Sequence, residues 1–200
     1  MILKQSEFYL DKGRRIKLAK KFVEGAVSNI KRVLSYYQNR GADLSLYINQ
    51  IKRLESLIAN QENINELMAI EGNIREIYYD SFSQIISDEN FKFEERTRRP
   101  PRNRLNALIS FGNSLVYMVS LSEIYKTHLD PRIGYLHTTN FRRFTLNLDV
   151  AEIFKPILAD RIIFYLLNKK MIKPSHFIKV LGGVSLNEKG RKVPNLPIRD

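Results

Sequence analysis

The segment 104–126 constrains the fold most, because it contains the longest apolar stretch of the chain, from Leu105 to Leu121. A helix that is apolar on every side has to be covered on every side, so we expect a central, buried helix and not a membrane span. The polar residues that interrupt its apolar run are Asn106, Ser110, Asn113, Ser114 and Ser120. The rest of the chain therefore has to supply elements that surround this helix.

Other segments repeat apolar residues with the 3.6-residue period of a helix. They predict helices over 14–37, 44–58, 64–86 and 149–168. A turn is expected at 130–134, leading into Tyr135-Leu136-His137. We therefore predict a mainly α fold, an irregular domain of many helices over residues 13–200.

The remaining segments predict shorter elements. Residues 1–12 are expected to be extended or a linker, and residues 88–101 to be a loop, because a proline disfavours helix in the residue before it. A short helix is expected to begin at Pro174, followed by a small hairpin over 178–186.

The charge of the chain indicates a polyanionic partner. The formal net charge is +12, which favours nucleic acid first and an anionic membrane surface second. There is no cysteine, so a disulfide framework and a thiolate metal site are excluded. This composition is compatible with a reducing cytosol, and we expect a cytoplasmic protein with no membrane partner.

Acidic residues are concentrated in one segment of this basic chain. Residues 61–90 hold seven acids against one base, Arg75. An acidic patch within a basic protein is typical of a metal-dependent nucleic-acid enzyme. From composition alone, scattered solvated charge explains the same pattern equally well.

Glu71 lies within the apolar face of the predicted helix 64–86. The apolar residues of that face are Ile64, Leu67, Met68, Ile74, Ile77 and Tyr78. An inward carboxylate is costly unless it is paired or bound to a cation. Two explanations stay open: a metal ion, or an ion pair with Arg75 one helical turn later.

Asp149 and Glu152 share a face of the predicted helix 149–168, and His137 precedes them in a loop. Two carboxylates and an imidazole suit a divalent cation such as Mn²⁺ or Mg²⁺. Each residue also has a simpler explanation. His137 alone is more often a structural hydrogen-bonding residue, and Asp149 alone is a plausible helix N-cap.

Three sequence blocks, taken together, carry a family resemblance. They are LMAIEGNIREIYY over 67–79, RRPPRNRLNALISFGNSL over 98–115, and GYLH over 134–137 followed by LNLDVAEIFKPILADR over 146–161. In order and spacing they resemble the CRISPR-associated integrase/endonuclease of spacer acquisition, the CRISPR-associated protein one family. The resemblance covers nearly the whole chain and corresponds to the family's C-terminal catalytic domain. We expect the family's N-terminal β domain to be absent, with residues 1–12 a linker or a remnant of it.

The resemblance implies site residues and a cofactor. By it, Glu71, His137 and Glu152 bind Mn²⁺ or Mg²⁺ and are catalytic, and Asp149 supports or shares the metal site. Asp160 also fits the family pattern, and we expect it to be structural, paired with a nearby base.

The resemblance also implies an activity and partners. The activity is the insertion of short foreign DNA spacers into a CRISPR array by transesterification, with cleavage of branched DNA. The implied partners are double-stranded and branched DNA, a second copy in a homodimer, and the small second CRISPR adaptation protein. The alternative is a truncated, catalytically inactive helical module that binds DNA or acts as a scaffold.

Basic residues outside the acidic segment are expected to hold DNA phosphates without reading sequence. They are Arg96, Arg98, Arg99, Arg102, Arg104, Arg142, Arg143 and Lys155. Tyr117 and Tyr135 are candidates for stacking on unpaired bases, although the apolar neighbours of Tyr117 favour packing in the core.

Overall fold

The structure, a computed structural model, describes residues 2–138 and 144–192, and it confirms a mainly α fold. The helices predicted over 14–37, 44–58 and 104–126 begin and end within two residues of the predicted positions. The elements are α1 (Ile2–Leu10), α2 (Lys12–Gln38), α3 (Ser45–Ile58), α4 (Ile64–Asp80), α5 (Phe82–Ile85), η1 (Glu89–Phe91), α6 (Arg104–Tyr125), α7 (Thr145–Lys155), η2 (Pro156–Asp160), α8 (Arg161–Asn168), η3 (Pro174–His176), β1 (Phe177–Val180), β2 (Gly183–Leu186) and α9 (Glu188–Arg191).

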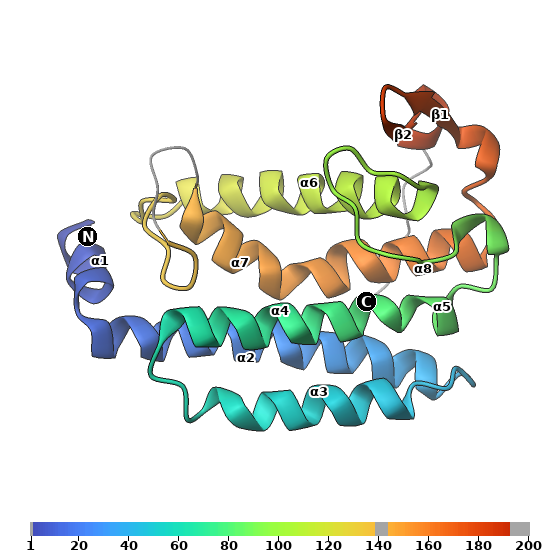
Figure 1. The fold of residues 1–200 in the computed structure, drawn as a ribbon. Helices are drawn as coiled ribbons and strands as arrows, with labels where there is room; N and C mark the ends of the chain where they lie inside the picture. The colour runs from blue at the N-terminus through green and yellow to red at the C-terminus, as the bar shows by residue number, and fades with distance from the viewer. Residues whose placement is uncertain (1, 139–143, 193–200) are drawn as a thin grey trace.

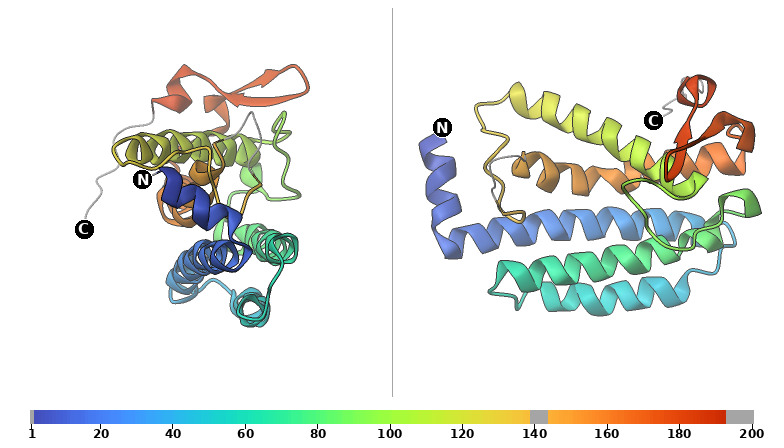
Figure 2. Two further views of the ribbon diagram at one scale, coloured as in Figure 1. Left: turned by 90° about the vertical axis from the view of Figure 1, so that its left-hand side faces the viewer. Right: turned by 45° about the horizontal axis from the view of Figure 1, so that its top comes forward.

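The long helices lie side by side in a stack. Figure 1 shows α6 along one edge, α7 and α8 next to it, then α2 with α4, and α3 on the far side. The end-on view in Figure 2 shows the same order, with α2 and α4 next to each other. Residues 126–138, which carry His137, are called the histidine loop below. This loop and α7 therefore lie between α4, the helix of the acidic segment 61–90, and the apolar helix α6.

The central helix is α2, which corrects the prediction that 104–126 would be central. α2 packs against α1, α3, α4, α7 and η2. It buries residues at helical spacing, namely Ala19, Val23, Ala26, Val27, Ile30, Val33 and Leu34.

Helix α6 is covered on one side and exposed on the other over its C-terminal half. Met118 is 61% exposed, and Leu115, Val119 and Tyr125 are also exposed. By length and composition α6 alone among the described helices would suffice to cross a bilayer, and 39% of that window is buried against the rest of the protein. Hydropathy predicted the helix correctly but not which of its faces is covered.

The first residues form helix α1, although the sequence predicted an extended segment. The side chain of Gln5 is almost wholly buried and forms hydrogen bonds with backbone groups of the loop that leads to His137. Its Nε2 donates to the carbonyl oxygens of Asp130 and Ile133, each at 2.9 Å, and its Oε1 accepts from the Asp130 N–H at 2.8 Å. Long-range contacts of this kind stabilise a helix that is too short to persist alone.

Two predicted helices are divided or displaced. The segment predicted as one helix over 64–86 breaks at Ser81, whose hydroxyl donates to the carbonyl of Tyr78. The helix predicted from 149 begins at Thr145 and passes through a π-helical turn at Pro156–Asp160. Asp149 is therefore inside the helix, and the N-cap interpretation is wrong.

The short elements after α8 agree with the prediction. Pro174 opens a 3₁₀ turn, and the antiparallel hairpin pairs Phe177 with Leu186 and Val180 with Gly183. The N–H of Val184 donates to the carbonyl of Pro101 at 2.8 Å. The hairpin is thereby hydrogen-bonded to the end of the loop that carries Arg98 and Arg99. That loop confirms the predicted break over 88–101, with only the short turn η1 inside it.

Candidate functional site

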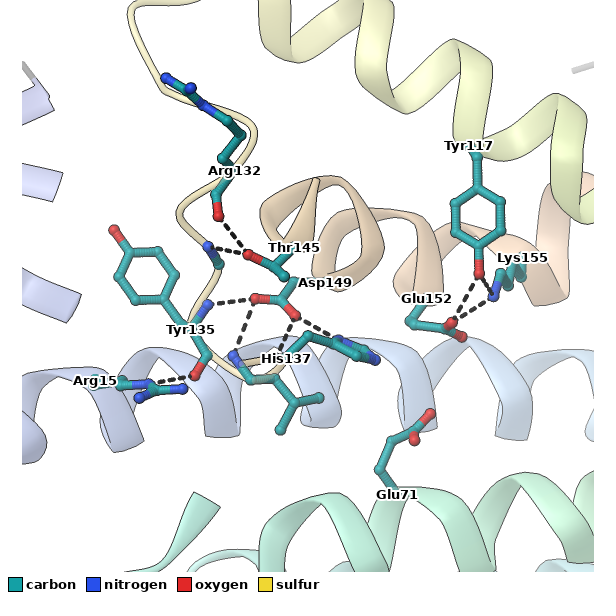
Figure 3. Close-up of polar contacts among 12 residues, drawn as sticks. Arg15, Glu71, Tyr117, Arg132, Tyr135, His137, Thr145, Asp149, Glu152 and Lys155 are labelled. Atoms are coloured by element: carbon teal, nitrogen blue, oxygen red, sulfur yellow. Dashed lines mark hydrogen bonds and ion pairs between the residues drawn. The ribbon is translucent and has the colours of Figure 1, made fainter. Parts of the chain in front are cut away.

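Asp149 organises the loop that carries His137. Its carboxylate is fully buried and accepts the backbone N–H groups of Tyr135 at 2.5 Å, Leu136 at 3.0 Å and His137 at 3.0 Å. The same carboxylate lies 2.8 Å from Nδ1 of the His137 ring (Figure 3). Because the carboxylate is the acceptor, Nδ1 carries a hydrogen, and in a neutral imidazole this leaves the lone pair on Nε2.

The start of α7 holds the same loop from its other end. The hydroxyl of Thr145 donates to the carbonyl of Arg132 at 2.6 Å and accepts from the N–H of Gly134 at 2.9 Å. A Cβ on Gly134 would lie 2.5 Å from the carbonyl carbon of Thr145 and 2.8 Å from a carboxylate oxygen of Asp149. Only glycine permits this close approach, so position 134 sets the distance between the loop and α7.

Arg75 joins the two candidate carboxylates Glu71 and Glu152. Its Nη2 contacts Oε1 of Glu71 and lies 2.5 Å from Oε2 of Glu152, and its Nε donates to Glu71 at 2.8 Å. The ion pair of Glu71 with Arg75 that the sequence allowed is therefore formed. Burial opposes the charge of Arg75, but attraction to Glu152 and Glu71 outweighs it and raises the Arg75 pKa above its ordinary value.

Glu152 has further partners besides Arg75. Lys155 donates to its Oε1, and the hydroxyl of Tyr117 lies 3.4 Å from the same oxygen. Burial acts to raise the pKa of Glu152, but Arg75 and Lys155 outweigh burial and lower that pKa to about 2. Glu152 is thus an anion whose charge is shared between two cations.

Lys155 is buried beside Glu152 and Tyr117. Its Nζ donates to the Tyr117 hydroxyl at 2.5 Å and lies 4.4 Å from the centre of the Tyr117 ring. Burial lowers the pKa of Lys155, and Glu152 acts against that effect. Figure 3 shows this cluster between α6 and α7, with Glu71 reaching from α4 toward Glu152.

Glu152, Lys155 and Tyr117 line a cavity of about 670 Å³, and Glu71 is not among the residues of its wall. Its wall includes Arg75, His137, Glu152 and Lys155, with Arg96, Arg98 and Arg99 also on the wall. Asn113 and Asn147 line it too, and their Oδ1 atoms are buried without a hydrogen-bond partner among residues 2–138 and 144–192. The cavity thus brings together imidazole, carboxylate and amide oxygens on its wall with exposed arginines.

The predicted DNA-binding residues differ in their surroundings. Arg98 and Arg99 are exposed at the cavity, whereas Arg96 is engaged with Asn106 at 2.9 Å and Ser110 at 3.1 Å. Arg102 is exposed and 3.6 Å from Glu95, and Arg104 lies near the carbonyl of Asn90. Arg142 and Arg143 lie outside the described residues. Arg98 and Arg99 are therefore the two arginines best placed to meet a ligand in the cavity.

Several residues have roles that the sequence did not indicate. The ring of Tyr135 is buried and stacks on Phe22, while Tyr117, expected in the core, lines the cavity.

Asp160 forms no ion pair with any described base, contrary to expectation. Burial raises the pKa of Asp160 to about 7, although attraction to Arg75 and Lys155 acts to lower it.

The predicted ligands Glu71, His137 and Glu152 come from three separate elements and face the same region of the molecule. Among the described residues, no three His, Asp or Glu side chains lie close enough together to hold an ion as they stand. Arg75 occupies the position between two of them. The contact of Arg75 with Glu152 joins distant parts of the sequence, and no local signal could have revealed it.

The family model of the CRISPR associated protein Cas1 matches residues 1–194. The chain belongs to the Cas1 family. It is 64% identical, over 96% of its length, to the CRISPR-associated endonuclease Cas1 2 of Thermodesulfovibrio yellowstonii. It is 46% identical to the CRISPR-associated endonuclease Cas1 of Thermotoga maritima, again over 96% of the chain. In each case this Cas1-family chain spans 58% of the length of the relative.

Solved structures show the same fold. A Cas1 protein from Thermotoga maritima superimposes with a TM-score of 0.89 at 46% identity, covering 96% of this chain and 60% of that one. A casposase bound to integration product superimposes with a TM-score of 0.85 at 24% identity, covering 94% of this chain and 56% of that one. The helical arrangement described above is therefore also that of the solved Cas1 protein, and the casposase shares the fold.

Proposed function

We propose that this chain provides the catalytic domain of a metal-dependent DNA endonuclease and integrase, which inserts short foreign DNA spacers into a CRISPR array by transesterification. The observation that carries the proposal is the single cavity in which His137 and Glu152 are accompanied by the exposed arginines Arg98 and Arg99. The relatives named above are CRISPR-associated endonucleases, which agrees with it.

The donor set fits Mn²⁺ or Mg²⁺. Carboxylate oxygens and an imidazole nitrogen are ligands for such ions, and the buried Oδ1 atoms of Asn113 and Asn147 offer neutral oxygens on the same wall. Glu71, His137 and Glu152 would hold the ion, with Asp149 in a secondary role. When bound, the ion supplies Lewis acidity at a phosphate oxygen and lowers the pKa of an attacking hydroxyl or water.

The chain's own residues position the reactants. Asp149 orients the His137 ring through Nδ1, which leaves Nε2 as the ring nitrogen that can face a ligand. Arg98 and Arg99 are free of any ion pair among the described residues and can bind phosphates of the DNA backbone. Lys155 and the Tyr117 hydroxyl share Oε1 of Glu152 and hold that carboxylate in place.

The partners follow from the same proposal. They are double-stranded and branched DNA, a second copy of the chain in a homodimer, and the small second CRISPR adaptation protein, with the cytoplasm as location. Complexes titled Cas6-RT-Cas1–Cas2 contain a chain of this fold, with a TM-score of 0.86. The net charge of +12 suits a nucleic-acid partner.

Cleavage of branched DNA in Mn²⁺ tests this function. The variants Glu71→Gln, His137→Ala and Glu152→Gln should each lose cleavage while DNA affinity persists. Glu76→Gln is the matched control, because Glu76 is on α4 like Glu71 but is exposed. Full nuclease activity in all three site variants would show that the site assignment is wrong.

A second candidate is a helical module that binds DNA without catalysis. The contact of Arg75 with both Glu71 and Glu152 favours it, because this guanidinium already neutralises the carboxylates. A salt-sensitive gel shift with no cleavage of branched DNA at any Mn²⁺ concentration would support this second candidate over the first.

A further inference from the structure

One atom of Arg75 contacts both candidate carboxylates. Its Nη2 contacts Oε1 of Glu71 and lies 2.5 Å from Oε2 of Glu152, so it sits where a cation shared by the two carboxylates would sit. The three side chains are only 10%, 17% and 12% exposed, for Arg75, Glu71 and Glu152 respectively. Weak solvent screening makes the charge of Arg75 important for holding two carboxylates together.

We propose that Arg75 is an internal counter-cation, which holds Glu71 and Glu152 when no divalent ion is bound and must leave this position for an ion to bind both carboxylates. The inference rests on the metal site of the proposed function. It makes metal binding an exchange of one cation for another and gives Arg75 control over metal affinity.

The first argument is competition for the same oxygens. Mg²⁺ binds carboxylate oxygens at about 2.0–2.1 Å, and an oxygen lone pair must point at the ion. Arg75 already uses Oε1 of Glu71 twice, through Nη2 and through Nε at 2.8 Å. With both donors in place, Oε1 cannot also bind an ion, and an ion held between the two carboxylates would lie at the position of Nη2.

The second argument is repulsion between cations. A divalent ion placed between Glu71 and Glu152 would also face Lys155, which bonds the other oxygen of Glu152. Lys155 is anchored by the Tyr117 hydroxyl at 2.5 Å, whereas the partners of Arg75 are the two carboxylates themselves. Arg75 is therefore the cation that an incoming ion displaces.

Replacing Arg75 should have opposite effects on metal affinity and on stability. Arg75→Met keeps an unbranched, flexible stem and removes the guanidinium group with its charge. In Mn²⁺ titrations followed by the electron paramagnetic resonance signal of free Mn²⁺, we expect its Kd to be at least tenfold lower than that of the wild type. Without metal the variant should unfold at a lower denaturant concentration, and Mn²⁺ should restore it. A residue with a merely structural role would weaken both properties.

Two further variants serve as controls. Arg75→Lys keeps the charge and should recover much of the wild-type Kd, while Arg53→Met removes an exposed arginine from α3 and should leave the Kd unchanged. If Arg75→Met binds Mn²⁺ no more tightly than the wild type, the inference is overturned. If in that case the wild type still binds Mn²⁺ and Glu71→Gln abolishes the binding, the metal site of the proposed function stands. Only the proposed role of Arg75 is then wrong.

The inference is also tested if the wild type binds no Mn²⁺. If the wild type binds no Mn²⁺ but Arg75→Met does, Arg75 blocks the site, as inferred. If neither binds, both the inference and the proposed metal dependence fail.

A measurement on the wild type covers the case in which Arg75→Met does not fold. The Nε–H of Arg75 donates to Glu71, so its resonance, assigned with Arg75→Lys, should shift and exchange faster with solvent when Mg²⁺ is added. An Nε–H signal that stays unchanged while Mg²⁺ binds would overturn the inference.

Discussion

Asp149 holds His137 twice with one oxygen: Oδ1 lies 3.0 Å from the backbone nitrogen of His137 and 2.8 Å from Nδ1 of its ring. The other oxygen accepts the N–H groups of Tyr135 and Leu136. A fully buried carboxylate thus fixes both the path of the loop and the hydrogen on the imidazole. Asp149 is a positioning residue in this structure, whether or not it also shares a metal ion.

Asp149→Asn should therefore impair both stability and function. An amide has one acceptor oxygen where the carboxylate has two, so at least one buried N–H loses its partner. We expect the free energy of unfolding to fall by about 1–3 kcal/mol, measured by urea denaturation. Mn²⁺-dependent cleavage should fall roughly 10–100-fold. Asp80→Asn, at the exposed end of α4, is the control, and equal effects of the two variants would contradict the argument.

Two glycine-to-alanine substitutions should change stability in opposite directions. In Gly134→Ala the new methyl would lie 2.5 Å from the backbone of Thr145, so the histidine loop must move, at a cost of about 1–3 kcal/mol. In Gly72→Ala the methyl meets nothing within 4 Å on α4, and the variant should gain about 0.5–1 kcal/mol. Thermal unfolding measures both, and a stabilised Gly134→Ala would show that the approach of loop and helix is not tight.

Periodicity predicted the long helices because each needs only a local pattern and one apolar face. It failed where the outcome depends on distant partners. The segment 1–12 is helical, with Gln5 bonded to the loop near Asp130, and 104–126 leaves Met118 exposed. For the site, sequence reasoning identified the pair of Glu71 with Arg75, because those residues are one turn apart. The contact of Arg75 with Glu152 depends on the packing of the tertiary structure, which a spacing rule does not contain.

Gln5→Ala should loosen the histidine loop from a distance. The substitution removes three hydrogen bonds to residues 130 and 133, including the one that the Asp130 N–H donates to Oε1 of Gln5. Amide hydrogen exchange should become faster at Asp130 while the centre of α2 stays protected. Gln38→Ala, which removes only an exposed contact with Ser45, is the control. Unchanged exchange at Asp130 would mean that α1 does not hold the loop.

Arg98 and Arg99 should contribute to DNA affinity through phosphate contacts. The double variant Arg98→Gln/Arg99→Gln should bind duplexes of different sequence more weakly by a similar factor. It should also reduce the slope of log K against log salt by about 1 for each arginine. Fluorescence anisotropy over a salt series measures this slope, with the exposed Arg53→Gln on α3 as control. A slope equal to that of the wild type would exclude contacts between these arginines and phosphates.

The buried Asp160 should make the protein less stable as pH rises toward neutrality. Burial raises its pKa from the ordinary 3.8 to about 7, so between these values the folded state binds the proton more tightly than the unfolded state. The free energy of unfolding therefore falls with rising pH in this window, by at most about 1.4 kcal/mol per pH unit.

Glu152 affects stability in a lower pH range. Its pKa is lowered from 4.5 to about 2, so its stabilising contribution is complete above about pH 4.5 and is lost below it.

Asp160→Asn isolates this effect because asparagine has nearly the same shape and does not titrate. The variant and the wild type should have similar stability below about pH 3.8, and the variant should be increasingly the more stable protein from there up to pH 8. Urea denaturation at half-unit pH intervals measures the difference. Parallel curves for the two proteins between pH 4.5 and 8 would show that Asp160 is already ionised throughout, in which case Arg75 and Lys155 stabilise its charge more than burial opposes it.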